Sequence, residues 1–236
     1  MIFTSKRLFV AVSILIIAIC ISIGIRQSRV NAFQSGVVPG SLEALALDVI
    51  AHNETSVTIG APKWMHAGVS GIDEAVANYT VVVAHPVSKN SYVWNSDFQM
   101  IGSWYKFVIT ETLVQKPYWA CSDCPPSPNP PAALLPLNSS EVLVPKAGGS
   151  VLVNGVTITS VDEEFPDYQL SQSYLLFLNV DTSKGVGMTA LAAGGVFTVS
   201  PSGQLVQVAE GTENSLANDI QTRYGNSLAS LRASLH

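Results

Sequence analysis

The sharpest chemical motif in the sequence is a pair of cysteines, Cys121 and Cys124, in the stretch Trp119-Ala-Cys-Ser-Asp-Cys-Pro. A Cys-x-x-Cys pair exchanges disulfides when a helix N-terminus stabilises the first thiolate. Pro125 and Pro126 follow the pair directly and no βαβ pattern surrounds it, so that helix is not predicted. We expect Cys121 and Cys124 to form a structural disulfide, with exported thiol–disulfide oxidoreductase activity as the alternative.

Other residues give weaker indications of chemistry. A zinc site would need two further ligands beside the cysteines, and neither a second cysteine pair nor a nearby histidine supplies them. The acids at 162–164 form a tight cluster, but three consecutive carboxylates on a loop are usually solvated rather than catalytic. The sequence therefore predicts a protein that is not an enzyme, with no catalytic residues, no metal and no cofactor. Tyr118 and Trp119, beside the cysteines, are candidate partner-contact residues.

An apolar run near the start of the chain indicates where the rest of it works. Residues 8–25 are 18 uncharged residues that follow Lys6 and Arg7. As a helix they would rise about 1.5 Å per residue, or roughly 27 Å, close to the ~30 Å hydrocarbon core of a bilayer. We expect residues 1–32 to be a membrane anchor or a signal sequence, with everything after them extracytoplasmic.

The two versions of this segment lead to different localisations. The small residues around 30–32 offer a signal-peptide cleavage site, which would release a secreted or periplasmic protein cut after Ala32. Arg26 and Arg29 lie between the run and that site, and basic residues there favour retention in the membrane. We therefore favour an uncleaved single-pass anchor through residues 8–25 over a cleaved signal sequence.

The charge of the exported part limits its partners. Residues 33–236 hold all 17 acidic residues but only eight of the 12 basic ones, a formal net charge of −9. Nucleic-acid binding needs clustered Lys and Arg, and here the basic residues are scattered singly. We therefore exclude nucleic acid, disfavour an anionic membrane surface, and expect an unidentified protein or small-molecule partner.

The rest of the sequence predicts a mainly β fold. Residues 33–75 suggest a stalk or N-terminal extension, with a helix or strand around 41–51. From Asn78 onward, short runs with a period near two predict a series of short strands, and Asn154-Gly155 is a strong hairpin signal. The many prolines of 116–137 predict an inserted loop. The expected strands are 79–83, 105–114, 140–144, 150–153, 156–161, 174–178, 186–191, 196–199 and 205–208.

The C-terminal segment, residues 209–236, switches to a helical period. Its apolar residues fall three or four positions apart, which places them on one face of an amphipathic helix that Gly225 interrupts. We expect this helix to pack across the β domain. The residues of that face are Leu216, Ile220, Tyr224, Leu228, Leu231 and Leu235.

The β region resembles a group of bacterial exported domains of unknown function with an oligonucleotide/oligosaccharide-binding (OB) type barrel. They are distantly similar to the netrin-like barrel of the tissue inhibitors of metalloproteinases. The similarity covers about residues 76–200 and departs from the group's pattern at Asn78, Lys116-Pro117 and Gln172-Ser173. The matching segments are 77–87, 105–114, Gly148-Gly149, Phe165, 174–178 and 194–199.

This resemblance implies an OB-like closed or partly open barrel over residues 76–208. It carries over no catalytic residues, so it favours a non-enzymatic binding or scaffolding domain. By analogy with the netrin-like barrel alone, inhibition of an exported protease is a second alternative.

Overall fold

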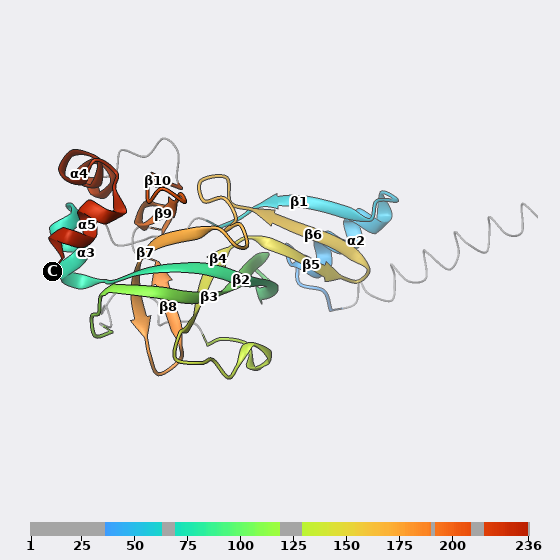
Figure 1. Cartoon of the computed structure of the whole chain (residues 1–236). Helices are drawn as coiled ribbons and strands as arrows, with labels where there is room; N and C mark the ends of the chain where they lie inside the picture. Colours follow the sequence, from blue (N-terminus) through green and yellow to red (C-terminus); the bar gives the residue numbers. More distant parts are fainter. Residues whose placement is uncertain (1–35, 63–68, 119–128, 190–191, 209–214, 236) are drawn as a thin grey trace, which may run out of the picture. The chain divides into compact units, whose positions relative to one another are not determined.

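The computed structural model describes residues 36–62, 69–118, 129–189, 192–208 and 215–235. The apolar run, the cleavage site at 30–32 and the motif with Trp119, Cys121 and Cys124 lie outside the described residues. Within the described ranges, no helix is both long and apolar enough to cross a membrane. The fold is mainly β, as the sequence predicts (Figure 1).

The chain divides into two compact units, and each is described by itself. The first unit consists of Met1–Val57, Asn95–Gln99 and Leu152–Ile158. The second unit consists of Thr58–Trp94, Met100–Val151 and Thr159–His236. Residues 33–75, predicted as an extension, supply α2 (Leu42–Ala51), β1 (Ser56–Gly60) and the start of α3 (Ile72–Asn78).

Among the described residues, the first unit includes α2, the turn at residues 96–99 and the turn between β5 and β6. Ser41 caps the helix, because its side chain accepts a hydrogen bond from the Ala44 amide at 3.2 Å. The Leu42 amide donates to the Ser96 carbonyl at 3.0 Å, which ties the start of α2 to the turn at residues 96–99. Asn154 and Gly155, with φ of 50° and 82°, form the hairpin turn that the sequence predicts between β5 (Gly149–Val153) and β6 (Val156–Val161).

The second unit is built on a ring of strands. Its sheet has the order β10-β9-β7-β2-β3-β4-β8, and an additional pairing of β7 with β8 closes β7, β2, β3, β4 and β8 into a ring. Within the ring β4 pairs with β8 in parallel, through Leu143 and Val186. A three-stranded sheet has the order β1-β6-β5. The strands not yet delimited are β2 (Thr80–Asn95), β3 (Met100–Val114), β4 (Glu141–Ala147), β7 (Ser173–Asp181), β8 (Val186–Thr189), β9 (Val196–Val199) and β10 (Leu205–Gln207).

The ring is apolar on both faces because its strands alternate two sets of buried side chains. Residues such as Val82, Phe107, Val144 and Leu176 come from four different strands and pack into one cluster, so they face the inside of the ring. The intervening residues of β2 and β7, including Phe177, pack in a second cluster on the outer face. This double burial explains the continuous apolar run 174–178.

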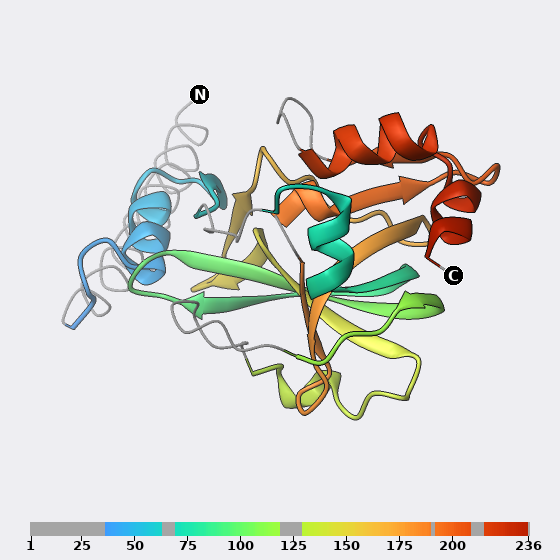
Figure 2. The same ribbon diagram turned by 90° about the vertical axis from the view of Figure 1, so that its left-hand side faces the viewer.

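Three helices cover the outer face of β7 and β9. The tail forms α4 (Ser215–Tyr224) and α5 (Leu228–Ser234), separated at Gly225, whose φ is 60°. This confirms the predicted amphipathic helix and its interruption, since Leu216, Ile220, Leu228 and Leu231 are all buried. Figure 1 and Figure 2 show α3, α4 and α5 together beside these strands.

Several elements differ from the sequence-based expectation, among them β1, which was not predicted, and β3, which begins at Met100 rather than near residue 105. The first strand of the ring does not stop near residue 83 but continues through Pro86 to Asn95. The short helix α3 was not predicted, because its seven residues give too little periodicity to detect. The described part of the 116–137 insertion contains no strand, as its prolines predict, and only one 3-10 turn, Ala132–Leu134.

Candidate functional site

A pocket of about 800 Å³ lies at one end of the ring, and we call it the mouth pocket. Neighbouring strands of the ring are mostly antiparallel, so the start of β2, the end of β3, the start of β4 and the end of β7 meet at this end. Each supplies lining residues: Thr80 and Val82, then Ile109 and Thr112, then Glu141 and Val142, then Val180. The pocket is therefore assembled from segments that are far apart in the sequence.

The floor of the mouth pocket is continuous with the interior of the ring. Val82 and Val142 line the pocket and belong to the interior cluster, and Ile109 and Val180 pack against that cluster. The described part of the insertion adds further aliphatic surface, including Leu135 and Leu137. A ligand in this pocket would meet Val, Ile, Leu and Pro side chains below and beside it.

The rim of the mouth pocket is polar, but its charged groups already have partners. Glu141 pairs with Lys106 at 3.7 Å and accepts a hydrogen bond from the Asn138 amide at 3.0 Å. Lys184 pairs with Asp181 at 3.9 Å. Hydroxyl and amide side chains make up the rest of the described polar lining: Thr80, Thr112, Gln115, Asn129, Asn138, Ser139, Thr182 and Ser183.

Thr80 holds the insertion at the edge of this pocket. Its hydroxyl donates to the Lys116 carbonyl at 3.2 Å and accepts from the Lys116 amide at 3.0 Å. These two bonds satisfy both backbone groups of Lys116, which lies just beyond the end of β3. They fix the first residue of the insertion against the start of β2.

The connection between β6 and β7, residues 162–172, packs against the interior cluster from the other end of the ring, and we call it the plug loop. Asp162 starts it, because its carboxylate accepts from the Glu164 and Phe165 amides at 3.2 and 3.1 Å. Tyr168 then packs edge-on against Tyr105, Phe107 and Tyr174, with ring centroids 4.9 to 5.2 Å apart. Such aromatic contacts are favourable beyond the area they bury.

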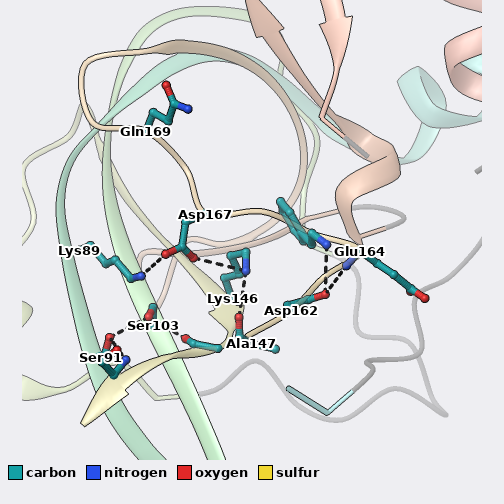
Figure 3. Close-up of polar contacts among 12 residues, drawn as sticks. Lys89, Ser91, Ser103, Lys146, Ala147, Asp162, Glu164, Asp167 and Gln169 are labelled. Carbon is teal, nitrogen blue, oxygen red and sulfur yellow. Dashed lines mark hydrogen bonds and ion pairs between the residues drawn. The ribbon is translucent and has the colours of Figure 1, made fainter. Parts of the chain in front are cut away.

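A cluster of charged residues fastens the plug loop. Figure 3 shows Asp167, on the loop, between Lys89 of β2 and Lys146 of β4. Lys89 donates a hydrogen bond to one carboxylate oxygen of Asp167, and the Lys146 ammonium lies 3.5 Å from the other. Lys146 also donates to the Ala147 carbonyl at 3.1 Å and lies 5.1 Å from the centre of the Phe165 ring. We call Lys89, Asp167 and Lys146 the Lys-Asp-Lys cluster.

Burial determines the direction of the pKa shift of Lys146, whereas the partners of Asp167 outweigh its burial. The Lys146 side chain is only 2% exposed, and this burial lowers the pKa of its ammonium although Asp167 opposes the shift. Burial by itself would raise the pKa of Asp167, but the hydrogen bond and charge of Lys89, helped by Tyr105 and Lys146, bring it below its ordinary value. Burial and the Asp167 charge raise the pKa of Tyr105. The arrangement keeps Asp167 ionised and bound to both lysines.

Glycines allow β4 to turn away beside this cluster. Gly148 and Gly149 have φ of 88° and 142°, which favour glycine, and they join β4 to β5. A Cβ on Gly149 would lie 2.4 Å from the Ser103 hydroxyl and 2.5 Å from that of Ser91. These two glycines therefore let the chain pass from β4 into β5 close to Ser91 and Ser103.

Only some of the residues singled out from the sequence lie at the two ends of the ring. Cys121, Cys124 and Trp119 lie outside the described residues, and Tyr118 is 37% exposed. Phe165, part of the resemblance, lies under Lys146. Among the described residues, no three His, Cys, Asp or Glu side chains converge on a position that could hold a metal ion.

Comparisons with known proteins give no relative. No protein-family model, no curated protein and no solved structure matches the chain. The two ends of the ring therefore have to be interpreted from their own residues.

The sequence did not reveal the Lys-Asp-Lys cluster. Its members are at positions 89, 146 and 167, and each appears as a single scattered charge. One signal was available, since Lys146 lies in the otherwise apolar stretch Val-Leu-Val-Pro-Lys-Ala, and a lysine buried in a strand needs a partner.

Proposed function

We propose that the chain is an exported or membrane-anchored, non-enzymatic binding domain with an OB-like barrel that takes its ligand into the mouth pocket. The ring of β2, β3, β4, β8 and β7 supports the OB-like assignment, because an OB fold is a five-stranded barrel, closed or partly open. The bacterial exported domains that the sequence resembles would share this barrel. Residues 8–25 would hold the domain at the membrane.

The mouth pocket carries the binding proposal. Ligand sites of roughly 300–1,000 Å³ occur preferentially in places such as the mouths of β-barrels, and they combine an apolar lining with a few polar groups. A pocket of about 800 Å³ with a floor of Val82, Ile109, Val142 and Val180 fits this description. The Lys-Asp-Lys cluster, by contrast, holds its carboxylate and ammonium groups to one another and serves to fasten the plug loop.

The lining favours a neutral ligand with an aliphatic part. Glu141 and Lys184 are already paired with Lys106 and Asp181, so a charged ligand would have to compete for them. The described lining contains no aromatic side chain, so stacking of a sugar ring or a base is not what it offers. Hydroxyl and amide groups on the rim suit a hydrogen-bonding head group such as an amide.

A matched set of small probes tests this proposal. Hexanamide, hexylamine and hexanoate share a chain length and differ in charge, and each can be titrated against the full chain in lipid nanodiscs while thermal unfolding is followed. Only hexanamide should raise Tm with saturation, because a ligand that binds only the folded state stabilises it. Equal responses to all three probes would contradict the proposed selectivity.

Two tryptophan variants locate the effect. Thr112→Trp places a large ring in the exposed rim and should abolish the hexanamide response. Thr58→Trp makes the same change on an exposed position of β1 and should leave the response intact. A response that survives Thr112→Trp would place the probe elsewhere and overturn the assignment of the pocket.

A further inference from the structure

The first unit carries exposed apolar side chains on or close to its turns. Phe98 is 76% exposed and Leu152 is 72% exposed, the highest values for large apolar side chains among the described residues. Val38, just before α2, is 47% exposed. Large apolar groups that a fold holds in solvent mark contact surfaces when they gather in one region.

The turn that carries Phe98 is held firmly. The Phe98 amide donates to the Asn95 side chain at 3.2 Å, and the Gln99 amide donates to the Ser96 carbonyl at 3.1 Å. Ser96 also accepts from the Leu42 amide at 3.0 Å, and its hydroxyl donates to Glu43. The backbone therefore presents Phe98 from a fixed turn next to the start of α2.

The start of α2 is also close in sequence to the predicted membrane segment, residues 8–25. Leu42 lies only 17 positions after Ile25, the end of the apolar run. A connection of this length spans at most about 60 Å when fully extended. If residues 8–25 lie in a bilayer, the tether keeps this unit near the surface and raises its effective concentration there.

We propose that the turn with Phe98 and the β5–β6 hairpin with Leu152 dock into the interface of the membrane that holds residues 8–25. Phenylalanine and leucine partition into the boundary between head groups and acyl chains, and burying either side chain favours the docked state roughly tenfold or more. Glu43 and Asp97 lie beside the Phe98 turn, so the surface that fits is zwitterionic rather than anionic. This inference rests on the anchoring part of the proposed function.

Depth-sensitive labelling of the full chain tests the docking. In a background with Cys20→Ala, Cys121→Ser and Cys124→Ser, one cysteine is introduced at a time and labelled with an environment-sensitive fluorophore. The protein is then placed in phosphatidylcholine nanodiscs that contain lipids with a spin-labelled head group. Labels at Phe98→Cys and Leu152→Cys should be quenched several-fold more than labels at Leu170→Cys and Val206→Cys, which are 53% and 57% exposed in the second unit.

A label at Ile16→Cys separates the docking from the anchoring. Strong protection of residue 16 from aqueous iodide, with residues 98 and 152 quenched by iodide as readily as residue 206, would overturn the docking and leave the anchor in place. An Ile16 label that iodide reaches would overturn both. Hydrogen exchange tests the docking without any cysteine substitution, because it uses the unlabelled full chain. Amides 95–99 should exchange more slowly in nanodiscs than in detergent micelles. Equal exchange in the two media would also overturn the docking.

Discussion

Removing the carboxylate of Asp167 should show how far the buried charge of Lys146 lowers the free energy of unfolding when it has no counter-ion. In Asp167→Ala, the Lys146 ammonium would keep the Ala147 carbonyl and the face of Phe165 but lose its counter-ion. Breaking a fully buried ion pair costs about 3–5 kcal/mol. Asp167 is 52% exposed, so water can replace part of its role, and we expect a loss of about 2–3 kcal/mol in the free energy of unfolding.

Changing Lys146 should rescue this loss. Lys146→Met replaces a buried ammonium with an apolar side chain of similar length, and Asp167 keeps its hydrogen bond from Lys89. That variant alone should lie within about 1 kcal/mol of the parent. The double variant Asp167→Ala/Lys146→Met should then be more stable than Asp167→Ala by about 2 kcal/mol, because no buried charge is left without a partner.

Urea denaturation followed by near-ultraviolet circular dichroism of the tyrosines around Tyr168 measures all four proteins of this cycle. The exposed pair Asp73 and Arg223, joined at 2.9 Å, provides a control, and Asp73→Ala should leave the urea midpoint nearly unchanged. If the effects of Asp167→Ala and Lys146→Met simply add, Lys146 does not depend on Asp167 and the electrostatic account of the plug loop is refuted.

Three further predictions address other parts of the molecule. Because the folded pKa of Asp167 lies below its ordinary value of 3.8, its contribution to stability is complete well above pH 3.8 and is lost as the pH falls through the folded pKa. The urea midpoints of the parent and of Asp167→Asn should therefore converge as the pH falls below the folded pKa of Asp167. A difference that stays constant with pH would contradict the stabilising role of the Asp167 carboxylate. Gly71→Ala should cost about 1–3 kcal/mol in the same urea assay, because a Cβ there would lie 2.2 Å from the Asp219 carboxylate that accepts from the Ile72 amide. Gly60→Ala, where nothing lies within 4 Å of the new atom, is its control and should be nearly neutral. Cys121 and Cys124 should resist alkylation in the native protein until a reductant is added, as judged by intact mass, and the protein should not reduce insulin. Turnover of insulin would favour the oxidoreductase alternative.

Local patterns in the sequence were sufficient to predict much of the secondary structure. Residues 174–178 are apolar at every position because both faces of β7 are buried, and this is visible without knowing what covers either face. Asn154-Gly155 predicted its hairpin because both residues tolerate positive φ, a property of the residues themselves. The helical period of the tail and its break at Gly225 were predicted for the same kind of reason. Residues close in sequence determine these features, so the sequence alone decides them.

The tertiary structure decided what the sequence could not show. The floor of the mouth pocket comes from the ends of four strands, with Val82 on β2 and Val180 on β7. These strand ends meet only when β7 pairs with both β2 and β8. The Lys-Asp-Lys cluster likewise forms only after the plug loop reaches across the ring to β2 and β4. Ion pairs and pockets depend on distances of a few ångströms between residues separated by tens of positions, and strand pairing, not sequence spacing, sets those distances.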